Sequence, residues 1–293
     1  MSSTRRSRTS RDASAGLEDA DRRRRRAGPS GLASRLAVAI PGVILAIVVV
    51  ALGGPAFAVV VAIVAVLGLA ELYSLTAAAR PLRWAGYLGT LAVLALAWLH
   101  EPSDEAILLG LGISLGLVAI GGLILSRRDE VTQRMATTLL GVVYIGVPLG
   151  IFLITRDLPH GAAAVANVLV GTWVFDTASY VGGRAFGRRP IAPLTSPGKT
   201  VEGFLVGLVV GTFSVWVAGL YMDWISHWQS LVLGLIICPA AYLGDLFESL
   251  LKRDAGAKDS GRILGGHGGI LDRFDALFFS AVASYFATIL LVY

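Results

Sequence analysis

Residues 55–75 read PAFAVVVAIVAVLGLAELYSL, an apolar stretch in which Glu71 is the one charged residue. A helix of this length is long enough to cross the roughly 30 Å hydrocarbon core of a bilayer. Because water is absent there, the backbone polar groups must bond within the segment, as an α-helix allows. The stretch therefore predicts a transmembrane helix.

Eight further apolar blocks share this pattern. We expect helices over 34–52, 83–99, 105–126, 135–155, 161–182, 201–221, 229–251 and 273–293. Hydrophobic residues make up 55% of the chain and charged residues 15%, whereas a soluble domain carries about 25% charged residues. The predicted fold class is an all-α integral membrane protein, a polytopic bundle of about nine transmembrane helices with two long cytoplasmic loops.

The first 31 residues differ from the rest in charge. They carry nine arginines, including the run Arg22 to Arg26, against four carboxylates, a net charge of +5, and the remaining chain is neutral. Such a segment has too few apolar residues to form a core, so we expect a disordered basic tail. No aromatic residue interleaves the arginines, which argues against nucleic-acid binding and favours a role in setting membrane topology.

The positions of the basic residues predict the orientation of the chain. With the N-terminal tail in the cytoplasm and nine spans, 24 of the 25 Lys and Arg residues fall on the cytoplasmic side, and only Arg156 does not. This asymmetry is what the positive-inside rule requires. The C-terminus at Tyr293 is then expected on the opposite side of the membrane.

The chain divides into three predicted parts. These are the tail (1–31), about five N-terminal transmembrane helices (32–160), and a region of about four helices (161–293) that holds the polar motifs. The two long loops, about 183–200 and 252–272, are polar, basic and rich in glycine, and both fall on the cytoplasmic side. Loops of this length in a compact protein are commonly functional.

One group of polar residues spans the second long loop. Asp245, Glu248 or Ser249, and Lys252 share one face of a helix, and Asp272 and Asp275 follow a glycine-rich run, 265–269. Ionisable groups at the edge of a transmembrane segment indicate a functional site. Carboxylates beside basic residues suit Mg²⁺ with phosphates, because Mg²⁺ takes oxygen ligands. Each residue also has an ordinary structural explanation, since Asp272 and Asp275 have the spacing of helix-capping residues and Lys252 could anchor a helix end.

A second group lies around the first long loop. Asp176 is near the end of one apolar block, and Gly198-Lys199-Thr200 opens the next. The spacing does not match a Walker A loop, but a helix N-terminus beside a lysine can still bind phosphate. An ordinary capped helix start with basic anchors is the alternative. Glu71 could face the same site or bond a neighbouring hydroxyl.

These residues resemble those of a known family. The stretch 249–275 follows the pattern S-L-L-K-R-x4-K-D-x-G-x2-L-G-x-H-G-G-I-x-D-R-F-D, which is similar to the signature of the phosphatidate cytidylyltransferases (CDP-diacylglycerol synthases). The segments D-x-A-x-Y-x2-G-R at 176–184 and S-P-G-K-T-x-E-G at 196–203 also resemble the family, with Gly198 where lysine is usual. The resemblance is specific over about 170–275, and the nine-span layout fits bacterial members.

The resemblance implies that phosphatidic acid attacks the α-phosphate of CTP, giving CDP-diacylglycerol and pyrophosphate, with Mg²⁺ required and a second monovalent or divalent cation left open. A multi-pass protein of the bacterial inner membrane is then expected, with its site facing the cytoplasm. Metal binding is assigned to Asp176, Asp245, Asp272 and Asp275, and catalysis to Asp245, Asp272, Asp275 and Lys252. Substrate binding is assigned to Ser196, Lys199, Arg253, Lys258, Asp259, Gly266, His267, Gly268 and Arg273.

Two alternatives remain open at this point. A CTP-dependent lipid kinase of the dolichol-kinase type would use related motifs and release CDP in place of pyrophosphate. A transporter would place its charges near the middle of the spans, whereas Asp176, Asp245 and Glu248 lie toward their predicted cytoplasmic ends. A homodimer is compatible with the family, although no residue of the sequence indicates one.

Overall fold

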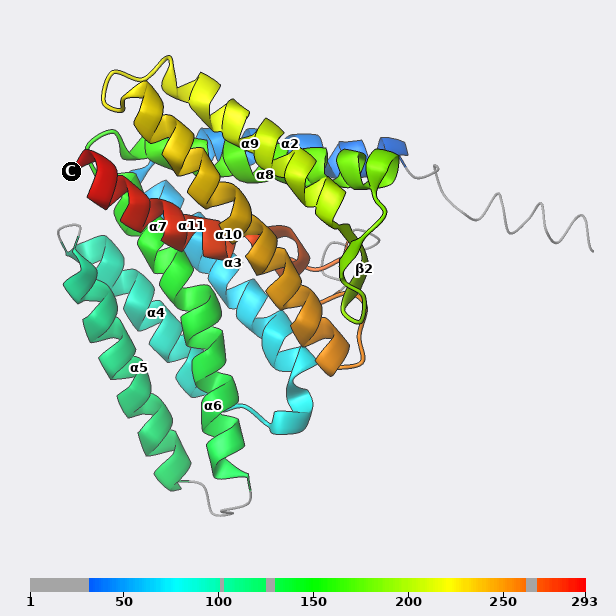
Figure 1. The fold of residues 1–293 in the computed structure, drawn as a ribbon. Coiled ribbons are helices and arrows are strands. Elements are labelled where there is room, and N and C mark those ends of the chain that lie inside the picture. Colours follow the sequence, from blue (N-terminus) through cyan, green and yellow to red (C-terminus); the bar gives the residue numbers. More distant parts are fainter. Residues whose placement is uncertain (1–31, 101–102, 125–129, 262–267) are drawn as a thin grey trace, which may run out of the picture. The chain divides into compact units, whose positions relative to one another are not determined.

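The computed structural model describes residues 32–100, 103–124, 130–261 and 268–293, with side chains from residue 41 onward (Figure 1). Nearly all of this described part is helical. The helices are α2 (Leu32–Leu52), α3 (Gly54–Leu75), α4 (Arg83–Leu99), α5 (Asp104–Ile124), α6 (Val131–Gly141), α7 (Val147–Asp157), α8 (Gly161–Phe186), α9 (Val201–Gly219), α10 (His227–Asp254) and α11 (Leu271–Val292). A π-helical turn, Val142–Gly146, joins α6 to α7, and a 3₁₀ turn, Ala77–Ala79, follows α3.

The prediction of an all-α polytopic membrane protein is confirmed. Within the described residues, seven helices are long and apolar enough to cross a bilayer, with α6 and α7 counted as one through their π turn. The two others, α4 and the part of α2 from Pro41 onward, are shorter apolar helices. Large apolar side chains remain on the outside of the protein, among them Leu108 at 67% exposure and Val209 at 69%. Lipid, rather than water, suits such a surface.

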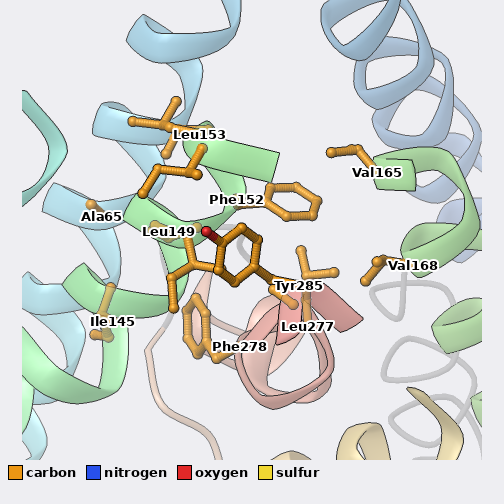
Figure 2. Close-up of a cluster of buried hydrophobic side chains, with 14 of the residues drawn as sticks. Ala65, Ile145, Leu149, Phe152, Leu153, Val165, Val168, Leu277, Phe278 and Tyr285 are labelled. Atoms are coloured by element: carbon orange, nitrogen blue, oxygen red, sulfur yellow. The ribbon is translucent and has the colours of Figure 1, made fainter. Parts of the chain in front are cut away.

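Among the described residues, those up to Ala46 and those from Ile47 onward form two units, and the following concerns the second. Its most extensive helix contacts pair α8 with α9, α10 with α11, and α4 with α5. The α7 helix packs against α3, α4, α8 and α11, so the joined α6–α7 helix is the most buried of the long helices in the described part. Figure 2 shows this core, where Ile145, Leu149 and Phe152 meet Leu277, Phe278 and Tyr285.

Small residues let α8 and α9 approach each other closely. Gly203, Gly207 and Gly211 recur every four residues on α9 and are all buried. A Cβ at Gly207 would collide with Ser179 and crowd Phe175 of α8. In a bilayer, helix association depends on such packing because lipid is as apolar as the side chains. This spacing explains how α9 lies flush against α8.

The π turn between α6 and α7 has a local cause in Pro148. Proline has no backbone N–H, and its ring clashes with the carbonyl four residues earlier, which belongs to Tyr144. The chain widens there, and the N–H of Val147 bonds the carbonyl of Val142, five residues back. Such turns recur at functional positions in helices, and this one places the Tyr144 ring against Phe247 of α10 and Phe278 of α11.

A small hairpin precedes α9. Strands β1 (Pro190–Ala192) and β2 (Ser196–Thr200) pair antiparallel, so the segment Gly198-Lys199-Thr200 is extended and the helix begins at Val201. The Thr200 side chain accepts the N–H of Gly203 and caps α9. The sequence predicted a loop over 183–200 but not this strand pairing.

Candidate active site

Three carboxylates from two helices form the centre of the site. Asp245 and Glu248 lie three residues apart on one face of α10, and Asp275 lies on the first part of α11. Ligand oxygens of the three side chains lie within 4.8 Å of one another. Glu248 is fully buried and Asp275 is 8% exposed. Buried carboxylates this close repel one another unless cations compensate them.

A close backbone contact brings these carboxylates together. Gly244 of α10 packs against the backbone of Asp275 and Ala276 on α11, and a Cβ at position 244 would collide with the Asp275 carbonyl. Only glycine allows this approach. The residue before Asp245 therefore sets the separation between the two helices at the level of the site.

Lys252 joins the cluster to the start of α11. Its Nζ lies 2.5 Å from Glu248 Oε2 and 2.7 Å from Asp272 Oδ1. Both ion pairs are largely shielded from solvent, since the side chains of Lys252 and Asp272 are 14% and 13% exposed. Removing one partner of such a shielded pair would leave the other charge buried without compensation, which is strongly destabilising.

The other oxygen of Asp272 binds the second long loop. Asp272 Oδ2 accepts the Ser260 N–H at 3.0 Å, the Ser260 hydroxyl at 2.9 Å and the Gly269 N–H at 2.8 Å. Asp272 lies in the first turn of α11, where a carboxylate is also favoured by the helix dipole. Its carboxylate thus holds Ser260 and Gly269 beside the start of α11 and orients Lys252.

Lys199 and Asp176, from two other elements, also lie beside the cluster. Lys199 Nζ, at the end of β2, lies 2.7 Å from Asp245 Oδ2 and 5.3 Å from the centre of the Tyr242 ring. Asp176 of α8 interacts electrostatically with both Asp245 and Lys199. The β1–β2 hairpin and α10, far apart in sequence, therefore contribute one lysine each, Lys199 and Lys252, to the same acidic site.

Arg253 ties the hairpin to the second loop. Its guanidinium donates to the carbonyl of Thr195, in the β1–β2 turn, and to the carbonyl of Ala257, both at 3.2 Å. The side chain is exposed, so these bonds lie at the surface and link the β1–β2 turn to the residues that follow α10.

The composition of the cluster fits a divalent cation. Five carboxylates face two ammonium groups, a formal excess of three negative charges: Asp176, Asp245, Glu248, Asp272 and Asp275 against Lys199 and Lys252. Glu248 Oε1 is buried and has no hydrogen-bond partner among the described residues. A buried charged oxygen without a donor is costly, and a hard cation such as Mg²⁺ would satisfy it.

Most residues predicted from the sequence lie around this centre. Asp245 and Asp275 belong to it directly, Lys199 and Lys252 pair with its carboxylates, and Asp176 lies nearby. Lys258, Asp259 and Arg273 are exposed, Ser196 begins β2, and a Cβ at Gly268 would collide with Asp272. Gly266 and His267 lie outside the described residues. The roles assigned to all of these residues stay predictions.

Sequence reasoning missed two contributors and left one open. Glu248 was seen to share a face with Asp245 but was not counted among the metal ligands. Tyr144 gave no sequence signal: its ring packs against Phe247 and Phe278, and its buried hydroxyl has no hydrogen-bond partner in the described part of the chain. Glu71, left open between two roles, bonds the start of α11.

Comparisons with known proteins identify the family of the chain. The sequence matches the model of the cytidylyltransferase family over residues 33–291. It is 32% identical to the phosphatidate cytidylyltransferase of Synechocystis sp., over 88% of this chain and 97% of that protein. The proteins of the same name from Staphylococcus saprophyticus and Staphylococcus aureus (strain COL) are 33% and 34% identical, over 66% and 64% of this chain and 73% and 72% of theirs.

Proposed function

The chain belongs to the cytidylyltransferase family, and we propose that it transfers the cytidylyl group of CTP to phosphatidic acid at the cluster of Asp245, Glu248 and Asp275. The products are CDP-diacylglycerol and pyrophosphate. The observation that carries this assignment of the site is the buried carboxylate group flanked by Lys199 and Lys252. Both substrates are phosphates, and both need this combination of cation-binding and cationic groups.

The position of the cluster suits one lipid and one soluble substrate. Asp245, Glu248 and Lys252 lie in the last third of α10, and Asp272 and Asp275 lie in the first turns of α11. A phosphatidate headgroup at the membrane surface can reach this level while its acyl chains stay among the helices and lipid. CTP can approach from water through the two polar loops.

The reaction balances without a covalent intermediate on the protein. A phosphatidate oxygen forms a bond to the α-phosphorus of CTP, and the bond from that phosphorus to the bridging β-oxygen breaks, so that pyrophosphate leaves. The attacking oxygen is already ionised near neutral pH, and no general base is required. Lys199 and Lys252 would neutralise phosphate charge and orient the triphosphate, which is the main source of rate in phosphoryl transfer.

The same site would hold the metal. Asp245, Glu248 and Asp275 are the proposed ligands, with Asp176 and Asp272 beside them. When bound, Mg²⁺ supplies positive charge to the phosphate oxygens and favours departure of pyrophosphate. The chain's own part is to place carboxylates from α10 and α11 around one point and to exclude lipid from it.

The protein is a multi-pass membrane protein, and its orientation is part of the proposal. We place both long loops and the N-terminus in the cytoplasm of a bacterial cell, at the inner membrane, because CTP is made there and nearly all basic residues fall on that side. A homodimer remains a prediction from the family.

Labelled CTP tests the reaction directly. Purified protein in detergent would receive phosphatidic acid, Mg²⁺ and CTP labelled at either the α- or the γ-phosphate. Label from the α-position should appear in the lipid, with pyrophosphate released. Label from the γ-position in the lipid would instead identify a kinase. If neither label reached the lipid, the result would contradict a cytidylyltransferase.

A further inference from the structure

Glu71 lies far from the acidic cluster in sequence, but it contacts Ser260 and the start of α11, which lie beside that cluster. It belongs to the last turns of α3 and is 3% exposed. Its Oε1 accepts the N–H of Ile270 at 3.0 Å, and its Oε2 accepts the N–H of Leu271 at 2.8 Å. A buried carboxylate is stable only with such donors, and these two N–H groups belong to the N-cap residue and the first residue of α11.

The Ser260 hydroxyl connects Glu71 to Asp272. Ser260 Oγ lies 3.2 Å from Glu71 Oε2 and 2.9 Å from Asp272 Oδ2. A hydroxyl has one proton to donate, so it bonds one carboxylate at a time, and the shorter distance favours Asp272. Ser260 Oγ also accepts the Asp272 N–H at 3.3 Å. The two carboxylates are thus held on either side of one small side chain.

The backbone at Gly269 leaves room for the Glu71 carboxylate. A Cβ at Gly269 would collide with both oxygens of Glu71 and with Ser260 Oγ. Gly269 is buried, and its N–H bonds Asp272 at 2.8 Å. Glycine at this position therefore lets one backbone segment contact both carboxylates.

From these contacts we infer that Glu71 is a positioning residue, which fixes the start of α11 and, through Ser260 and Asp272, the placement of Lys252. The path continues from Asp272 to Lys252 and from Lys252 to Glu248. A helix of the N-terminal half, otherwise lipid anchor and scaffold, thereby controls the geometry of the acidic cluster. The inference concerns the same site as the proposed function and rests on it for its kinetic consequence.

Glu71→Gln is the variant that tests this inference. The amide side chain keeps the size of the carboxylate, but loses its charge and replaces one acceptor oxygen by a donor, which faces an N–H group. Amide exchange over 268–275 should accelerate at least about 10-fold, and kcat/KM for CTP should fall by about 10- to 100-fold, as for groups that orient the ligands of a site. Glu71→Asp keeps the charge and should recover part of both.

Tyr73→Phe is the matched control. Tyr73 lies two residues away on α3, is fully buried, and donates its hydroxyl to the Thr138 carbonyl at 2.9 Å without touching the loop. Its loss should lower thermal stability while exchange over 268–275 and the KM for CTP stay at wild-type values. An equal kinetic loss in Tyr73→Phe would overturn the inference, because the effect would then belong to α3 in general.

Ser260→Ala keeps the test decisive if Glu71→Gln fails to fold. It removes the hydroxyl that links the two carboxylates but leaves Glu71 bonded to Ile270 and Leu271. The kcat/KM for CTP should still fall, whereas the rate of amide hydrogen exchange at the start of α11 should change less than in Glu71→Gln. Wild-type exchange and wild-type kinetics in a folded Glu71→Gln would refute the positioning role. Wild-type protein without CDP-diacylglycerol synthesis would refute the proposed function instead, and the exchange result would still stand on its own.

Discussion

Lys199 Nζ lies 2.7 Å from Asp245 Oδ2, so the hairpin before α9 and the middle of the acidic cluster on α10 are joined by one ion pair. The lysine side chain is 16% exposed and the aspartate 35%, which keeps the pair reachable from solvent. A lysine in this place neutralises a carboxylate that we propose as a metal ligand. A cation bound to Asp245 would compete with Lys199 for that carboxylate and would leave the ammonium group able to pair with a phosphate.

Asp245→Asn removes one charge from the centre of the cluster. We expect the rate of CDP-diacylglycerol formation to fall by about 10²- to 10³-fold, the loss typical of one preorganised electrostatic contact. Initial rates in mixed micelles measure it. Asp254→Asn, at the exposed end of the same helix, should leave the rate unchanged, and equal loss in both variants would argue against a special role of Asp245.

Glu248→Gln tests metal binding without relying on turnover. Glu248 Oε1 is buried without a hydrogen-bond partner in the described residues, and we propose that it faces the cation. Mn²⁺ affinity, measured by electron paramagnetic resonance in detergent, should fall by about 10- to 100-fold. The exposed Glu105 on α5 offers the control Glu105→Gln. Unchanged affinity in Glu248→Gln would remove Glu248 from the ligand set.

Lys199→Met should weaken the use of CTP. The variant keeps the length of the side chain but cannot neutralise phosphate charge, so kcat/KM for CTP should fall by about 10²-fold. Lys199→Arg should lose less. Arg188→Gln, in the same loop, is a suitable comparison because the Arg188 side chain is exposed and its backbone N–H makes the contact with Glu202. A loss as large in Arg188→Gln would point to general loop electrostatics.

Arg156→Gln should affect stability and leave catalysis intact. Arg156 donates to the Val50 carbonyl at 2.7 Å, near the C-terminus of α2, where a cation is favoured by the helix dipole. Its loss should cost about 1 kcal/mol of stability, visible as a lower midpoint in thermal unfolding monitored by size-exclusion chromatography. The kcat and KM values of the folded fraction should match wild type, and changed kinetics would contradict this purely structural role.

Thiol labelling tests the orientation of the chain. Cys238 is the single cysteine and is fully buried, so wild-type protein should give a low background. Ala255→Cys and His227→Cys place an exposed thiol at opposite ends of α10. In intact cells, a membrane-impermeant maleimide should label position 227 and not 255. The reverse pattern would invert the proposed topology.

The helices could be predicted closely from the sequence because lipid imposes a simple rule on length and polarity. The α3, α4 and α8 helices begin within a residue of their predicted starts. The hairpin at 190–200 could not be predicted from the sequence, since short polar strands show no alternation of apolar and polar residues. The prediction also gave no cause for Arg156 on the far side of the membrane, whereas the structure shows it bonded to Val50.

The sequence indicated most residues of the acidic cluster but not the contacts between them, and their functional roles stay predictions. Acidic and basic residues near helix ends marked Asp245, Lys252 and Asp275 because charges there are costly. The partners of Glu71 depend on how α3 packs against the second loop, and no local spacing encodes that contact. Tyr144 lies in the π turn that Pro148 promotes. The turn rotates the following residues about the helix axis, so the 3.6-residue period of an α-helix does not predict which side chains face the core.

Gly244 has a consequence for the choice of ion. Because α10 and α11 touch there through their backbones, the gap between Asp245 and Asp275 is set by main-chain atoms that cannot give way as long side chains can. Mg²⁺ needs oxygens at about 2.1 Å and Ca²⁺ at about 2.4 Å. If the distance between the ligand oxygens is fixed, the site fits an ion of one size better than others. We therefore expect Ca²⁺ to bind poorly or to bind without supporting turnover. Selectivity for the smaller ion would then be a property of helix packing, encoded in the absence of a single methyl group.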